Sequence, residues 1–265
     1  MRSIVIPAQR SAEFENRLET ALSLARVHHS HVTVLIDTPI SQFVVTDMYG
    51  GPQVAADALR EACEADVLLG QRLDSRLASQ DVAFDIVERI DDPVEAVCDT
   101  ALLADLIVAD LAFPRLAELL VGTSTPVLAL PPLRRPGAPD PMLLNRAAMI
   151  AWDGSRAAAR ALRAAIPLLR GFASVHVVSV RRKADTEFPQ TDALHYLARH
   201  DIRAEYRECV AENSIEETLF REAARLDAQL LVMGAFGHSR LREFLTGGVT
   251  RYFLTGKAVP LFLAN

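Results

Sequence analysis

The amino-acid sequence contains an internal repeat, and this repeat constrains the fold more than any other feature. Residues 2–36 align without a gap with residues 146–180, so that Ile6 meets Ile150. Three later segments recur in the same order, at offsets of 120, 124 and 134 residues. A chain of 265 residues is long enough for two domains of about 130 residues each. We therefore predict two copies of one structural unit.

A proline-rich segment separates the two copies. Five prolines fall within the eleven residues 131–141, and each of them fixes φ and removes an amide donor. We accordingly place the first domain at residues 1–131, the linker at 132–145 and the second domain at 146–265.

Short apolar runs rich in valine and isoleucine alternate with longer segments whose apolar residues recur every three or four positions. This alternation is typical of parallel strands joined by crossover helices, and it predicts an α/β fold with five strands in each copy. In the second copy we expect strands at 147–151, 175–180, 204–209, 230–233 and 260–263, and helices at 156–169 and 215–226. Ser155 and Ser214 are the predicted N-caps of these helices. The final strands of the two copies, each led by a proline, are expected to pair with each other as edge strands.

Insertions distinguish the two copies. The alignment offset falls from 144 to 120, which gives the first copy 24 extra residues, much of them in the helical pattern 54–77. The offset later rises from 124 to 134, which gives the second copy 10 extra residues after Met233. We expect the chemistry of the protein in this second insertion because it is rich in glycine.

Composition excludes several classes of function. The net charge is −6 and no long basic cluster is present, which disfavours nucleic-acid binding. No run reaches the roughly 18 to 20 apolar residues of a spanning helix, so we expect a soluble, cytoplasmic protein without membrane contact. Cys63, Cys98 and Cys209 are widely spaced, and we predict small buried apolar residues rather than disulfides or a zinc site.

Catalytic and metal-binding patterns are also missing. The sequence lacks Gly-x-Ser-x-Gly and the lysine of a Walker A loop, so any ATP hydrolysis is expected to be slow. His28, His29 and His31 cluster at a turn, but side chains at such close spacing on a surface turn seldom converge on one ion. We expect a binding protein rather than an enzyme, and no metal site.

A glycine-bearing loop follows the fourth strand of the second copy. Gly234 and Gly237 come first, and Gly247 and Gly248 then open another helix. Glycines let backbone amides approach a ligand closely, and free amides at a helix start suit a phosphate. The alternative interpretation is that Gly234 and Gly237 only turn the chain after a strand.

The second copy also contains the run Asp153-Gly154-Ser155 after its first strand, the spacing G-2x-G-9x-G in the loop, and a final Val259-Pro260. With these motifs the chain resembles the universal stress protein family, in its tandem two-domain form. The resemblance covers both halves. It implies two Rossmann-like parallel sheets of the adenine-nucleotide α-hydrolase-like type, with ATP or AMP, with or without Mg²⁺, at the carboxyl edge of the C-terminal domain only.

The resemblance assigns roles to residues of this chain. Asp153 would contact the adenosine portion, and Val180 and Met233 would flank the base. The remaining cofactor-binding positions that it implies are Ala151, Gly234, Gly237, His238, Arg240, Gly247, Gly248, Val249 and Thr250.

Two departures from the family pattern qualify these roles. Gly248 stands where the family usually has serine or threonine, and a missing hydrogen bond to phosphate would weaken affinity about tenfold or more. His238 and Arg240 would offset part of this loss, unless they are only exposed polar residues. In the first copy Gln9 and Asp110 stand where the second copy has Asp153 and Gly234, and ten loop residues are missing. We expect no nucleotide there.

The leading functional hypothesis is a stress-response protein that binds an adenine nucleotide and acts on a protein partner. Slow ATP hydrolysis at the same loop is one alternative, and a nucleotide-free interaction module is another. Similarity to the family also makes a homodimer an expected assembly.

Overall fold

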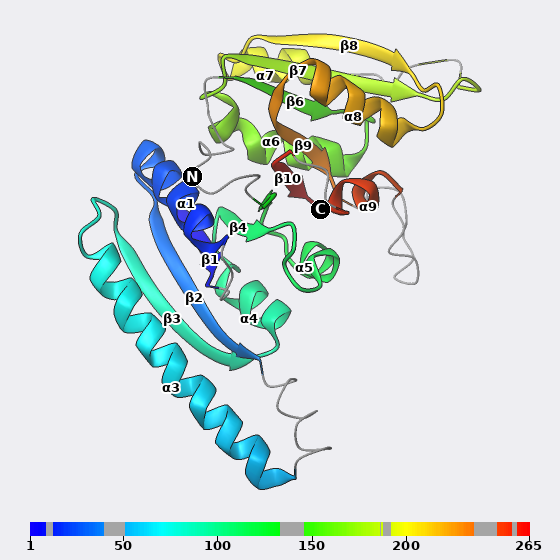
Figure 1. Cartoon of the computed structure of the whole chain (residues 1–265). Coiled ribbons are helices and arrows are strands. Elements are labelled where there is room, and N and C mark those ends of the chain that lie inside the picture. The colour runs from blue at the N-terminus through cyan, green and yellow to red at the C-terminus, as the bar shows by residue number, and fades with distance from the viewer. Residues whose placement is uncertain are drawn as a thin grey trace. The chain divides into compact units, whose positions relative to one another are not determined.

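The computed structural model describes residues 1–8, 13–39, 51–132, 146–185, 187, 192–235, 248–255 and 259–265. The chain divides into two compact units, which Figure 1 shows together. The first unit comprises residues 1–109 and 113–125, and the second comprises residues 110–112 and 126–265.

The first unit alternates strands with helices. Its elements are β1 (Ser3–Pro7), α1 (Phe14–His28), β2 (His31–Pro39), α3 (Pro52–Leu77), β3 (Phe84–Asp91), α4 (Pro93–Thr100), β4 (Leu106–Asp110) and α5 (Leu116–Gly122). The strands follow the order β3-β2-β1-β4, and all three neighbouring pairs are parallel. This is the alternating α/β architecture that the hydrophobic pattern predicts.

Helix α3 accounts for most of the insertion in the first copy. Its 26 residues span about 39 Å, whereas the nine residues of β2 span about 30 Å. Figure 1 shows α3 running along β2 and β3 and extending past their ends. Leu73 and Leu77 near its end are buried, while Val54 in its first turn is half exposed. The buried residues of the helix therefore lie in its second half, from Asp66 onward.

The second unit contains a complete five-stranded parallel sheet. Its elements are β5 (Val127–Leu130), β6 (Ala147–Ala151), α6 (Arg156–Leu169), β7 (Ser174–Arg181), α7 (Ala193–Arg199), β8 (Ala204–Val210), α8 (Ile215–Arg225), β9 (Ala228–Gly234), α9 (Gly248–Leu254) and β10 (Leu261–Ala264). The parallel strands follow the order β10-β9-β6-β7-β8. Strand β5, from the first sequence copy, joins this unit and pairs antiparallel with β10, with Leu128 opposite Phe262. The predicted pairing of the two final strands is thus confirmed.

The boundaries of the second copy agree closely with the sequence analysis. Strand β6 and helix α6 have the predicted bounds. The oxygens of both predicted N-caps accept amide hydrogens, Ser155 from Ala158 at 3.0 Å and Ser214 from Glu217 at 3.1 Å. The other predicted bounds differ from the structure by one or two residues at one or both ends. For example, β9 begins at Ala228 rather than Leu230, β10 begins at Leu261 rather than Pro260, and α8 ends at Arg225 rather than Leu226. Proline lacks the amide that a first strand residue donates, which explains the shift in β10.

Crossover handedness determines how the helices of the second unit cover its sheet. The path β6 to β7 to β8 runs in one direction along the sheet, and the path β8 to β9 to β10 runs in the other. Because parallel crossovers are right-handed, α6 and α7 cover one face while α8 and α9 cover the opposite face. The direction therefore reverses between β6 and β9. Strand cores such as Ile150 and Val232 are fully enclosed between these layers.

Candidate functional site

The carboxyl end of β6 is held firmly against that of β7. The amide of Trp152 donates to the carbonyl of Val178 at 2.9 Å, and the Ser179 hydroxyl donates to the Trp152 carbonyl at 3.0 Å. Sequence reasoning missed both Trp152 and Ser179 because neither belongs to a recognisable motif. Together they fix the point at which the chain leaves the sheet, directly before Asp153. The preceding residue, Ala151, is the half-buried last residue of β6.

Asp153 lies at the exposed start of α6. Its Oδ1 atom accepts a hydrogen bond from the amide of Ser155 at 2.9 Å. Gly154, between them, has φ of 75°, a left-handed conformation that favours glycine. Ser155 then caps the helix. The run Asp153-Gly154-Ser155 therefore builds a tight turn that presents a carboxylate at the carboxyl edge of the sheet.

Gly234 ends β9 and lies directly against the first turn of α6. A Cβ atom at this position would be 2.5 Å from the Ala158 nitrogen and 2.6 Å from the carbonyl carbon of Ala157. Backbone atoms within a helix cannot move aside, so only glycine fits here. The sequence allows a ligand or a turn as the reason for this glycine, and the structure adds a third reason, which is close packing between strand and helix.

The positions expected to flank the base differ in exposure. Val180, near the end of β7, is half-buried, and Met233, near the end of β9, is 4% exposed. Because β6 pairs with both β7 and β9, these residues and Asp153 belong to one edge of the sheet. Met233 thus suits the floor of a site rather than its rim.

The structure describes the last glycine of the loop, Gly248, and the helix that begins there. Gly248 is exposed, Val249 is half-buried and Thr250 is buried, all in the first turn of α9. A Cβ atom at Gly248 would lie 3.7 Å from Oε1 of Glu216, which is an ordinary contact distance. Four of the predicted positions, Gly237, His238, Arg240 and Gly247, lie outside the described residues, as does Gln9 of the first copy.

A polar pocket of about 370 Å³ opens beside this edge, at the ends of β7 and β8. Its charged lining residues are Arg182, Lys183, Glu212 and Glu216, and the capping residue Ser214 also lines it. This pocket was not predicted from the sequence. The only available signal was the predicted helix start at Ser214, which does not reveal what lies opposite.

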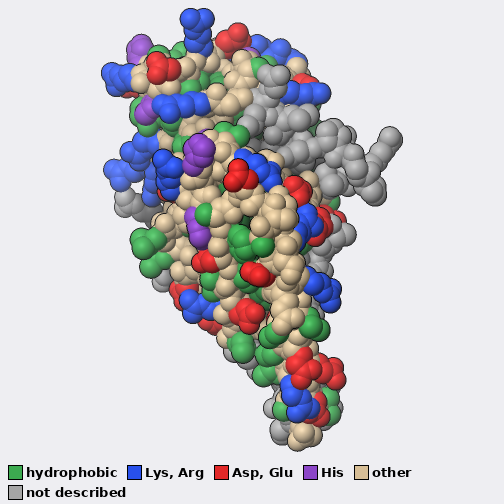
Figure 2. Space-filling view, turned by 90° about the vertical axis from the view of Figure 1, so that its left-hand side faces the viewer, with side chains coloured by type: hydrophobic (Ala, Val, Ile, Leu, Met, Phe, Trp, Pro, Cys, Tyr) green, Lys and Arg blue, Asp and Glu red, His purple; other side chains and the backbone are tan. Residues whose placement is uncertain are grey.

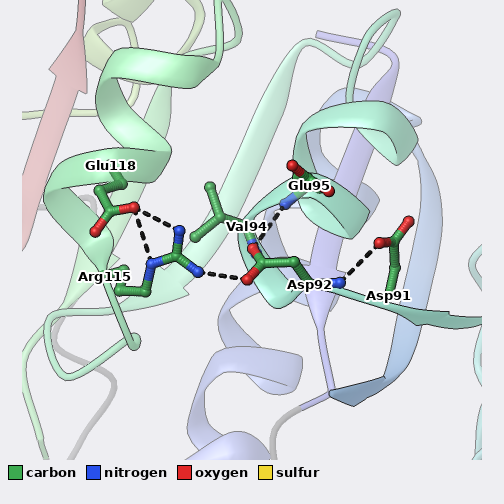
Figure 3. A network of polar contacts seen from close by, with 6 residues as sticks. All are labelled: Asp91, Asp92, Val94, Glu95, Arg115 and Glu118. Carbon is green, nitrogen blue, oxygen red and sulfur yellow. Dashed lines mark hydrogen bonds and ion pairs between the residues drawn. The ribbon is translucent and has the colours of Figure 1, made fainter. Parts of the chain in front are cut away.

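The corresponding edge of the first copy is bridged by an ion-pair network (Figure 3). Asp92 caps α4 by accepting from the amides of Val94 at 3.0 Å and Glu95 at 3.4 Å. Arg115, immediately before α5, donates to the Asp92 carboxylate and to Glu118, with 2.9 Å from its Nε to Glu118 Oε2. The starts of α4 and α5 are therefore linked through one guanidinium group.

This network shifts the ionisation of its members. Partial burial acts to raise the pKa of Asp92, but hydrogen bonds from Arg115 and from the helix amides outweigh it and lower that pKa. A hydrogen bond from Arg115 likewise lowers the pKa of Glu118, and the two carboxylates raise the pKa of Arg115. All three groups therefore stay charged at neutral pH.

Other residues singled out in the sequence do not form a site. Within the described ranges, no three histidine, cysteine or acidic side chains are grouped so as to hold a metal. His31 pairs with Asp85, with 3.0 Å between Nε2 and Oδ1. The three cysteines are free, and they are half-buried rather than buried as predicted. Figure 2 shows acidic and basic side chains interspersed over one face of the molecule rather than in a single basic stripe.

The sequence of the second copy matches a known family. Residues 145–263 match the profile of the Universal stress protein family. These residues therefore form a universal stress protein domain. No curated protein matches the chain.

Solved structures show that the universal stress protein fold extends over both copies. A universal stress protein from Archaeoglobus fulgidus DSM 4304 has a TM-score of 0.73 at 15% identity, covering 99% of this chain and 98% of that one. A protein assigned to the same family from Pseudomonas aeruginosa UCBPP-PA14 has a TM-score of 0.62 at 16% identity, covering 100% and 93%. A protein of unknown function from Pseudomonas aeruginosa PAO1 gives 0.61 at 17% identity, covering 100% and 92%. At these identities the likeness establishes the fold.

In the described part of the chain, no helix is both long and apolar enough to cross a membrane.

Proposed function

We propose that the C-terminal copy binds an adenine nucleotide, ATP or AMP, at the carboxyl edge of its sheet, and that the bound state acts on a protein partner in a stress response. Family membership of residues 145–263 supports the class of function. The arrangement of the strands supports the location.

The observation that carries the proposal is the reversal of strand order between β6 and β9. In open parallel sheets, ligands bind beyond the carboxyl ends of the strands at the point where the order reverses. Asp153 follows β6 and Gly234 ends β9, so the motif residues flank this point. The residues that motif spacing indicates therefore lie at the site that the sheet topology indicates.

The chemistry of these residues fits a nucleoside. The Asp153 carboxylate, exposed beside the capped start of α6, can accept hydrogen bonds from hydroxyl or amino groups of the adenosine portion. Half-buried Val180 offers an apolar surface to a base. The glycine loop that ends at Gly248 would then bring backbone amides to the ribose and phosphates, and a bound Mg²⁺ would offset phosphate charge. The bound nucleotide is proposed as a regulatory ligand, with any turnover slow.

Calorimetric titration tests this proposal. We expect ATP and AMP to bind the wild type and GTP to bind at least tenfold more weakly, because the base pocket is proposed to select adenine. Asp153→Ala should abolish detectable binding. Asp153→Asn is the matched variant, since it retains an oxygen for the Ser155 amide but loses the charge. Nucleotide affinity that is unchanged in Asp153→Ala, in a protein with wild-type thermal stability, would refute the proposed site.

A further inference from the structure

Glu216 is a charged residue at the proposed nucleotide site whose role the motif does not explain. It lies in the first turn of α8 and lines the pocket at the ends of β7 and β8. Its Oε1 atom lies 3.7 Å from the place where a Cβ atom of Gly248 would be. Gly248 is the position at which the resemblance expects a hydroxyl that binds phosphate. A carboxylate therefore stands beside a proposed phosphate position.

Helix packing fixes this arrangement. The rings of Phe220 and Tyr252 meet edge to face, with 6.4 Å between their centroids. Phe220 follows Glu216 by four residues and Tyr252 follows Gly248 by four residues, so each ring lies one helical turn further along the same face. The aromatic contact therefore holds α8 and α9 in a register that sets Glu216 opposite Gly248.

The charge of Glu216 is less compensated than the charges of Glu212 and Glu222 on either side of it. Glu212 pairs with Arg221 at 2.8 Å, and Glu222 pairs with Arg225 at 3.0 Å. Among the described residues, Glu216 has no cation within ion-pair distance. Arg182 and Lys183 line the same pocket, so they moderate its field without pairing with it.

The first copy has no such charge at the matching position. Glu216 is the second residue of α8, and the second residue of α4 is Val94, which is 7% exposed. The fold therefore accepts a buried apolar side chain where the second copy has a carboxylate. Packing does not require Glu216 to be acidic.

We propose that Glu216 sets the charge that the nucleotide site accepts, by weakening the binding of ligands in proportion to their phosphate charge. The inference rests on the proposed function, because it concerns the same site. A fixed carboxylate repels each additional phosphate charge, and this repulsion is strongest where water is partly excluded. The site would thereby favour adenosine monophosphates over the metal-free triphosphate.

Titration of adenosine, AMP and ATP in the absence of divalent cations tests this inference, with wild type and Glu216→Gln compared. We expect the substitution to tighten ATP binding about tenfold and AMP binding about threefold, and to leave adenosine binding unchanged. The gain for ATP should shrink at high salt, because ions screen exposed charges.

Glu217→Gln is the matched control, since Glu217 lies on the same turn, is exposed and accepts a hydrogen bond from Asn213 at 3.3 Å. It should leave all three affinities unchanged. An equal change for all three ligands in Glu216→Gln, or no change for ATP, would overturn the inference while leaving the proposed function intact. If neither protein binds adenosine, AMP or ATP, the proposed function itself fails, and the inference fails with it.

Discussion

The two copies carry matching elements at the carboxyl edges of their sheets, but the edges are completed differently. In the first copy, Arg115 precedes α5 and bridges to Asp92, the N-cap of α4. In the second copy, the matching N-cap is Ser214, and Gly247 precedes α9 in the sequence. The first copy shows that the fold can connect these elements with a short loop and an ion pair. The fold therefore does not explain the glycine-rich insertion of the second copy, whereas the proposed ligand binding would.

Substitution of Gly234 should have the largest effect on the difference between the two copies. The first copy carries Asp110 at the matching position. Gly234→Ala would place a methyl group 2.5 Å from a helix nitrogen. We expect the second unit to lose about 3 kcal/mol of unfolding free energy, as overpacked cores do. Denaturant unfolding followed by circular dichroism measures this loss.

Gly248→Ala is the matched control for that experiment. A Cβ atom there makes only an ordinary contact with Glu216, so stability should stay within about 0.5 kcal/mol of the wild type. Equal losses for the two variants would show that the close approach of α6 to Gly234 is not what requires glycine.

Gly248→Ser tests whether the loop of the second copy binds phosphate. The position has room for a side chain, and a hydroxyl there restores a donor that the family usually places next to phosphate. We expect ATP to bind about tenfold more tightly, as a hydrogen bond to a charged group predicts. Calorimetry measures the gain, with adenosine as the ligand that should not respond. Unchanged ATP affinity would indicate that the new hydroxyl donates to Glu216 instead.

Substitutions of Asp92 test the ion-pair network of the first copy, and they should have a small effect on stability. Asp92→Ala removes an N-cap and should cost about 1 kcal/mol, whereas Asp92→Asn keeps a capping oxygen and loses only the charge. Because the pKa of Asp92 is lower in the folded state, its charge stabilises the protein above the unfolded pKa of about 4, and this contribution disappears as the pH falls through the folded pKa. The stability of Asp92→Asn should therefore approach that of the wild type at acid pH. Thermal unfolding at neutral and acid pH checks this, and a gap that persists in acid would contradict it.

Local signals in the sequence predicted much of the fold. The bounds of β6 follow from an apolar run ended by Asp153 and Gly154, and α6 begins where Ser155 can cap it. The internal repeat then extended the α/β assignment to both copies. These features depend on neighbouring residues, which is why a single sequence reveals them.

Contacts between distant segments were not predictable in this way. Arg115 contacts Asp92, which lies 23 residues earlier in the sequence. Arg115 also adopts a left-handed conformation with φ of 59°, which the sequence does not predict because the residue is neither glycine nor asparagine. Glu216 meets Gly248 only because the strand order brings α8 and α9 together. The reason for Gly234 likewise lies in a helix that begins 78 residues earlier, at Arg156.

The central claim is that the second copy alone carries a nucleotide site. Denaturing the purified protein and counting the released nucleotides by mass spectrometry, for wild type and Asp153→Ala, tests it most directly. We predict one adenine nucleotide per wild-type chain and none from Asp153→Ala. Two nucleotides per chain, or one that Asp153→Ala retains, would contradict the account.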